Sequence, residues 1–193
     1  GPYPQAIWHY GRGTALARTG KLDAAAQELE RLERLAAEPA LLALKIKNLN
    51  PAAQLVRIAA LTLRADIALA RGEAPAAVAL LREATAIEDA LQADEPHLWL
   101  APTRHALGAA LLAAGLADQA ERVYRQGLQH YPNNGWSMNG LARALEQQGR
   151  RARLLHLGVD GLAIAGLELS GEEGLLAVDH HAAMGGKCRA LEH

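Results

Sequence analysis

The sequence predicts an all-α protein, and two observations support this prediction. Half of the 193 residues are hydrophobic, yet only 4% are aromatic and Phe is absent. Ala and Leu, which are strong helix formers, therefore supply most of the apolar content, while strand formers are scarce. In addition, a pattern of small residues, leucine or alanine, and glycine recurs at fixed offsets, as in repeated helical hairpins.

In this recurring pattern, glycine follows the first small residue by seven positions and precedes an alanine by five. A single helical hairpin cannot bury its apolar face, whereas stacked hairpins can. The pattern therefore predicts three to four antiparallel helix-turn-helix repeats. The copies are Gly13-Leu16-Gly20-Ala25, Ala65-Ala68-Gly72-Ala77, Gly108-Leu111-Gly115-Ala120 and a partial copy, Ala142-Leu145-Gly149, with Leu154 in place of the final alanine.

The first repeat is expected to pair a helix over 5–19 with one over 22–37. Gly20 ends the first helix, because a left-handed backbone costs glycine little, and Pro39 ends the second. The apolar segment 40–47 is expected to form a short extra helix or an elongated hairpin. Asn50 is then expected to be the N-cap of the next helix, with the following proline in its first turn.

The remaining repeats are separated by progressively shorter intervals. Their glycines lie 52, 43 and 34 residues apart along the chain. Trp99 stands between Pro96 and Pro102 in the least regular connection, and 132–135 is expected to form a turn. The expected helices are 51–70 paired with 74–93, 102–114 paired with 117–130, and 136–148.

The third copy resembles the tetratricopeptide repeat, whose usual length is the last interval of 34 residues. The residues that carry the resemblance are Leu107, Gly108, Leu111, Gly115, Ala120, Tyr124, Leu128 and Pro132. The resemblance extends over about 5–150. It implies a right-handed α-solenoid from a bacterial protein, in which the first helix of each repeat lines a concave groove that holds a peptide or another protein.

The resemblance also implies which side chains line this groove, two from the first helix of each repeat. These are Tyr10 and Thr14, Thr62 and Asp66, His105 and Ala109, and Asn139 and Arg143. Trp99 is expected either to pack on neighbouring helices or to overhang the groove. Trp8 and Trp136, which lie near helix starts, are expected to pack against the hairpins.

No catalytic constellation, cofactor motif or metal-ligand spacing is recognisable, so we expect a protein that is not an enzyme and holds no cofactor or metal. Its net charge of −1 and interspersed charges argue against nucleic acid as a partner. No apolar run is long enough to cross a membrane. The single cysteine, Cys188, fits a cytoplasmic protein and also the many periplasmic proteins without disulfides.

The predicted organisation is a repeat domain over 1–153 and an atypical Gly-rich tail over 154–193. Gly1-Pro2 and Leu191-Glu192-His193 are expected to be remnants of a protease site and a histidine tag. The favoured function is a non-catalytic module that binds a protein or peptide. Two alternatives stay open: a regulatory or accessory segment of a larger enzyme or sensor, and a self-assembling scaffold that forms a homo-oligomer.

Overall fold

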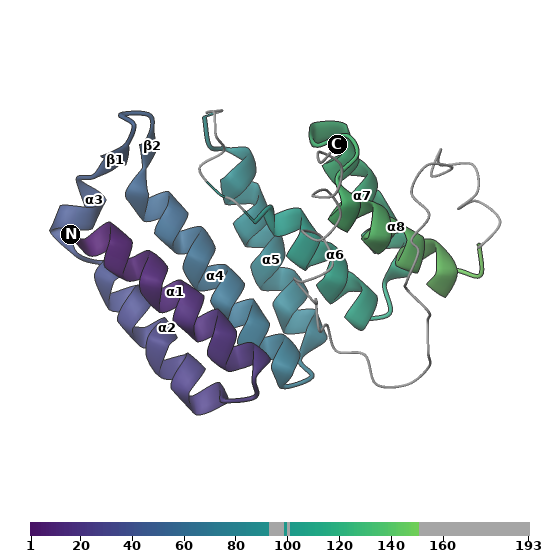
Figure 1. Cartoon of the computed structure of the whole chain (residues 1–193), viewed down its shortest axis with the longest axis horizontal. Coiled ribbons are helices and arrows are strands. Elements are labelled where there is room, and N and C mark those ends of the chain that lie inside the picture. Colours follow the sequence, from purple (N-terminus) through teal and green to yellow (C-terminus); the bar gives the residue numbers. More distant parts are fainter. Residues whose placement is uncertain (93–98, 100, 151–193) are drawn as a thin grey trace, which may run out of the picture. The chain divides into compact units, whose positions relative to one another are not determined.

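The computed structural model describes residues 1–92, 99 and 101–150, and helices dominate this part of the chain (Figure 1). All the elements described lie in one compact unit. The all-α prediction is confirmed, and helix bounds differ from the expected ones by a few residues. The longer helices are α1 (Pro2–Arg18), α2 (Leu22–Ala36), α4 (Ala52–Ala70), α5 (Ala74–Asp89), α6 (Thr103–Ala113), α7 (Ala117–His130) and α8 (Gly135–Gln147).

The helices stack in chain order, as the repeat pattern predicts (Figure 1). Three hairpins form, α1 with α2, α4 with α5 and α6 with α7, and the second helix of each hairpin packs against the first helix of the next. The first helices α1, α4, α6 and α8 also contact one another in turn. This arrangement brings residues of successive first helices to the same side of the stack. The predicted tail, 154–193, lies outside the described residues.

The periodic glycines end their helices in the predicted way. Gly20, Gly72, Gly115 and Gly149 all have a positive φ, between 69° and 78°. Leu116, the residue after Gly115, closes the turn with a hydrogen bond of 2.8 Å from its backbone N to Leu111 O. A side chain in this backbone conformation costs roughly 1–2 kcal/mol. The positions of these glycines in the sequence therefore mark where the first helix of each hairpin ends.

The segment between the first two hairpins contains a short extra helix, which is one of the two forms expected for 40–47, but this helix ends at Leu42. It forms one helical turn, α3 (Pro39–Leu42), and a short antiparallel pair of strands, β1 (Lys45–Ile46) and β2 (Asn50–Pro51). The predicted N-cap role of Asn50 is wrong, because its side chain is buried and bonded elsewhere. Asn50 Nδ2 donates to Gln92 O over 3.0 Å, and Gln92 N donates to Asn50 Oδ1 over 2.8 Å. Asn50 thus ties the strand pair to the end of the second hairpin.

A carboxylate from the preceding helix satisfies the first amide of α6. Pro102 at the N-cap offers no side-chain acceptor, and Glu88 of α5 supplies one instead. Glu88 Oε2 accepts hydrogen bonds from Thr103 N over 2.8 Å and from Thr103 Oγ1. Burial raises the pKa of Glu88, although the bonds from Thr103 act in the opposite direction. The pairing fixes the start of the third hairpin against the second.

One aromatic ring lies where the third hairpin and α8 meet. Tyr124 of α7 is buried, and its ring lies against Gly108 of α6 and Gly140 of α8. A Cβ atom would lie 2.3 Å from Tyr124 Cζ at Gly108 and 2.1 Å from it at Gly140. Gly13 plays the same part in the first hairpin, where a Cβ would lie 2.5 Å from Leu63 Cδ2. The small residues of the pattern therefore leave room for large neighbours at the helix crossings.

We predict that Gly140→Ala lowers the free energy of unfolding by about 1–3 kcal/mol, because the added methyl group overpacks the Tyr124 ring. Urea unfolding followed by circular dichroism measures the change. Gly11→Ala in α1 is the matched control, since nothing lies within 4 Å of its Cβ position. That control should be neutral or stabilising by up to about 1 kcal/mol, because alanine is the better helix former. Equal effects of the two substitutions would contradict the steric argument.

Candidate functional site

The predicted groove residues lie on the first helices of the stack, in pairs one helical turn apart. Because α1 contacts α4, α4 contacts α6 and α6 contacts α8, the helices that carry these pairs follow one another in the stack. The residues are Tyr10 and Thr14 on α1, Thr62 and Asp66 on α4, His105 and Ala109 on α6, and Asn139 and Arg143 on α8.

At the α1–α4 end of this row, Tyr10, Thr14 and Asp66 form a compact group with Trp99. The rings of Tyr10 and Trp99 lie 5.4 Å apart at an interplanar angle of 45°. Trp99 is only 8% exposed and belongs to the apolar core of the first two hairpins. Of the two roles predicted for Trp99, packing on neighbouring helices is therefore observed. The ring that Trp99 packs against belongs to Tyr10, which is one of the predicted groove residues.

Burial dominates the electrostatics of this group. It raises the pKa of Asp66 to about 6, although the positive charge of Arg18 and the nearby Thr14 hydroxyl act in the opposite direction. Burial also raises the pKa of Tyr10 to about 12, and the charge of Asp66 adds to this effect. Asp66 is therefore a carboxylate kept largely from water that still ionises at neutral pH.

Several polar atoms of the row have no hydrogen-bond partner among the described residues. They include one from each of the first three first helices and one from the tryptophan: Thr14 Oγ1, Asp66 Oδ2, His105 Nε2 and Trp99 Nε1. Thr14 lies close enough to Asp66 to lower its pKa, yet the two oxygens make no bond of ordinary geometry. Buried polar groups are nearly always paired in folded proteins, so an added donor or acceptor would be favourable here.

The other predicted groove residues differ in how accessible they are. Thr62 is buried, and its hydroxyl donates to Ile58 O over 2.8 Å within the same helix. Burial lowers the pKa of His105, which favours the neutral imidazole. Asn139 is half-buried and Arg143 is exposed. The row is therefore dry and acidic near α1 and α4, and wetter and basic at α8.

The sequence analysis missed a second group of polar and charged side chains, centred on Glu28 of α2. Glu28 is 2% exposed, and its carboxylate is 2.6 Å from His9 Nδ1, 2.8 Å from Arg31 Nη1 and 3.5 Å from Arg12 Nη1. Its position was the available signal, since it lies three residues after Ala25 and four before Leu32 on the buried face of α2. A charged residue there needs partners that bring its charge into balance.

The predicted packing of Trp8 and Trp136 is wrong. Their side chains are exposed, Trp8 by 56% and Trp136 by 57%. Trp8 lies edge-on to His9 with centroids 4.9 Å apart, and the Arg12 guanidinium lies 5.2 Å from its ring centroid. Trp8 thus belongs to the surface above the Glu28 group rather than to the core.

Among the described residues, no cluster of three or more His, Cys, Asp or Glu side chains could hold a metal ion. Within the same part of the chain, the helices are too short or too polar to cross a membrane. His180, His181 and Cys188 lie outside the described residues.

Residues 101–144 match the family model of the tetratricopeptide repeat. The match covers α6, α7 and most of α8, which is the part of the chain with the Tyr124–glycine contacts. It confirms the resemblance inferred from the third copy of the pattern. Repeats of this kind are in general protein–protein interaction modules. No curated protein and no solved structure matches the chain.

We predict that the stability of the protein falls as pH rises from about 4 to about 6. In this window folded Asp66, with a pKa of about 6, holds a proton that the unfolded chain, at about 3.8, has lost. The decrease is at most about 3 kcal/mol, from a shift of about two pKa units. Urea unfolding at several pH values measures it, and Asp66→Asn should remove this part of the pH dependence.

The control for this measurement is Asp118→Asn, which removes an exposed carboxyl group of α7. The Asp118→Asn profile should follow that of the unchanged protein. The profile of each variant must be subtracted from that of the unchanged protein, because Glu88, whose pKa is also raised, contributes to the pH dependence of all three proteins. If the profile of Asp66→Asn were as steep as that of Asp118→Asn, Asp66 would not be the buried titrating group.

Proposed function

We propose that this chain is a non-catalytic interaction module that binds a peptide or protein segment along the row formed by α1, α4, α6 and α8. The tetratricopeptide match over 101–144 supports the general class of function. The order of the helices supports the choice of surface, because each first helix contacts the next one.

One observation supports the α1–α4 end as the anchoring point. Thr14 Oγ1, Asp66 Oδ2 and Trp99 Nε1 are buried together without hydrogen-bond partners among the described residues, beside the Tyr10 ring. An unsatisfied buried polar group costs roughly 1–3 kcal/mol. A segment that supplies hydrogen bonds to these atoms would recover part of that free energy, whereas a purely apolar segment would not.

The electrostatics of this end favour a donor group in the partner. Asp66 is mostly ionised at pH 7, since its pKa is about 6, and within the described residues no ion pair neutralises it. The positive charge of Arg18 lowers the pKa of Asp66 without forming an ion pair with it. A lysine or arginine side chain, or a backbone amide, is the chemistry that complements Tyr10 and Asp66. The row would then bind an extended or helical segment whose hydrogen-bond donor lies next to Asp66 of α4.

We predict that peptides selected from a random display library by the immobilised protein carry a lysine or arginine. Asp66→Asn should lower the affinity of the protein for these peptides about tenfold or more. A charge-assisted hydrogen bond is worth about 1.5–3 kcal/mol, which corresponds to that factor. Isothermal titration calorimetry measures the affinity. Tyr10→Ala should also weaken binding, because it removes the aromatic wall beside the carboxylate.

Gln27→Ala on α2 is the control, because it changes an exposed side chain away from the row. It should leave the affinity unchanged. Asp66→Asn is expected to fold at least as well as the unchanged protein, so a loss of affinity cannot be ascribed to unfolding. Selected peptides that bind Asp66→Asn and Tyr10→Ala as tightly as the unchanged protein would refute the proposal.

A further inference from the structure

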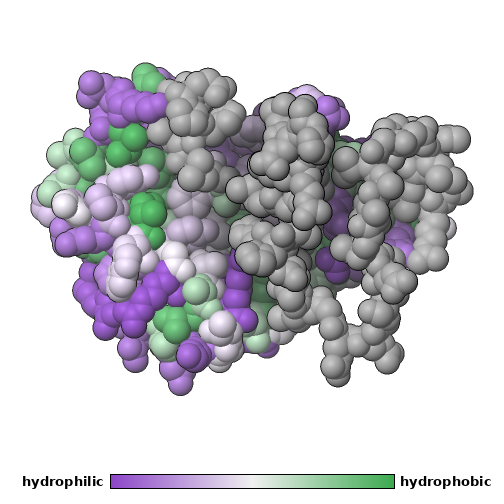
Figure 2. All heavy atoms as spheres, in the orientation of Figure 1, coloured by the Kyte–Doolittle hydropathy of each residue, from purple (hydrophilic) through white to green (hydrophobic). Residues whose placement is uncertain are grey.

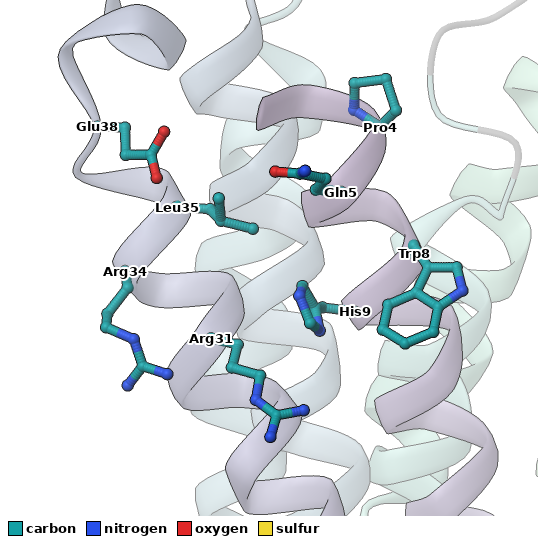
Figure 3. A pocket seen from close by; sticks show the side chains of 8 residues that line it. All are labelled: Pro4, Gln5, Trp8, His9, Arg31, Arg34, Leu35 and Glu38. Carbon is teal, nitrogen blue, oxygen red and sulfur yellow. The ribbon is translucent and has the colours of Figure 1, made fainter. Parts of the chain in front are cut away.

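A cleft of about 680 Å³ opens between α1 and α2 (Figure 3), and neither Tyr10 nor Thr14 lines it. One wall comes from the first turns of α1, and the other comes from the end of α2 and from Glu38, two residues after it. Figure 3 shows Gln5, His9 and Leu35 directed toward the space between the two helices, while the Trp8 ring lies at the edge of α1 away from α2. The lining residues are Pro4, Gln5, Trp8 and His9 on one wall, and Arg31, Arg34, Leu35 and Glu38 on the other.

Positive charge is in excess around Glu28, beside this cleft, and Arg31 is the arginine of that group that also lines the cleft. The two guanidinium groups of Arg12 and Arg31 face the single carboxylate of Glu28, so one positive charge is in excess there. Glu28 is 3% exposed at its side chain, while Arg12 and Arg31 are 52% and 44% exposed. The negative charge is thus sealed beneath the surface, and the positive charges reach water.

An apolar surface lies directly beside these cations. The Trp8 ring is 56% exposed and lies under the Arg12 guanidinium, and Pro4 and Leu35 add to the same cleft. Figure 2 shows hydrophobic patches set among hydrophilic residues at the end of the molecule formed by α1, α2 and α3. An exposed tryptophan next to arginine is a common anchor of protein interfaces. A ligand for this cleft therefore needs both an apolar side chain and an anionic group.

We propose that the α1–α2 cleft binds an acidic peptide segment, in which a carboxylate reaches Arg12 and Arg31 while an adjacent apolar side chain packs on Trp8. The carboxylate would accept hydrogen bonds from the guanidinium faces that Glu28 leaves open. Since Glu28 already positions Arg31, little side-chain ordering is needed on binding. This site is independent of the row on α1, α4, α6 and α8.

The charges around the cleft favour a peptide carboxylate over a polyanion. Glu38 lies at one end of the cleft, and Glu30 lies 4.0 Å from Arg34 at the rim. A nucleic acid or an anionic membrane would bring many phosphates against these carboxylates and against a chain of net charge −1. A single carboxylate beside an apolar residue avoids that repulsion.

The test uses a fluorescein-labelled twelve-residue peptide in which glutamates alternate with leucine and phenylalanine. Fluorescence anisotropy at low salt measures its binding to the full chain, next to a peptide with glutamines in place of the glutamates. The acidic peptide should bind about tenfold more tightly than the glutamine peptide. Arg31→Gln and Trp8→Ala should each reduce its affinity about tenfold.

Arg82→Gln on α5 is the matched control, because it removes the same charge from an exposed position on another hairpin. It should leave the affinity within about twofold, and so should Asp66→Asn, which separates this site from the row. Thermal unfolding of each variant checks that the fold is retained. Should Arg31→Gln unfold the protein, Arg12→Gln and Trp8→Ala carry the test, since Trp8 does not bond to Glu28 and Arg12 is 52% exposed and 3.5 Å from the Glu28 carboxylate.

Three results would overturn the proposal. The first is equal affinity for the acidic and glutamine peptides. The second is binding that survives both Arg12→Gln and Trp8→Ala. The third is sedimentation showing that the protein self-associates through Trp8, because a second copy of the chain would then occupy the cleft.

Discussion

The structure depends on how closely its helices can approach one another at a few small residues. Tyr124 fills the space that Gly108 and Gly140 leave open, and Leu63 fills the space at Gly13. These contacts fix the separation and register of neighbouring helices. The face presented by each first helix follows from that register, because a residue one turn away from a crossing has a defined direction. The positions of Tyr10, Asp66 and His105 therefore depend on glycines that are not themselves part of the row.

Features set by local sequence were predictable, and features set by distant contacts were not. The helix ranges follow from periodicity, and the hairpin turns follow from glycines with positive φ. Asn50 was misread because its partner, Gln92, lies 42 residues away, which no capping pattern reveals. Trp8 was misread for a similar reason. Its hydrophobicity suggests burial, but α1 turns its other faces to α2 and α4, and Arg12 covers part of the ring instead.

The candidate site shows the same division. Repeat positions place Thr14 and Asp66 on one side of the stack, but they do not say how much water reaches them. The raised pKa of Asp66 arises from burial among parts of the chain that are far apart in sequence. Thr62 has an equivalent position, yet it bonds to its own helix and is closed to a partner. Glu28 escaped notice because a search for apolar periodicity passes over a charged residue on a buried face.

The two acidic groups on either side of α1 make opposite demands on a partner. Asp66 is a buried carboxylate with an oxygen that lacks a donor, so it favours a cation or an amide. Glu28 has more cationic neighbours than its own charge can balance, so the surface above it favours an anion. Residues 10 and 14 serve the first group, whereas residues 9 and 12 serve the second. One helix can thus separate two recognition chemistries, because a step of one or two residues turns the side chain by roughly 100° or 200°.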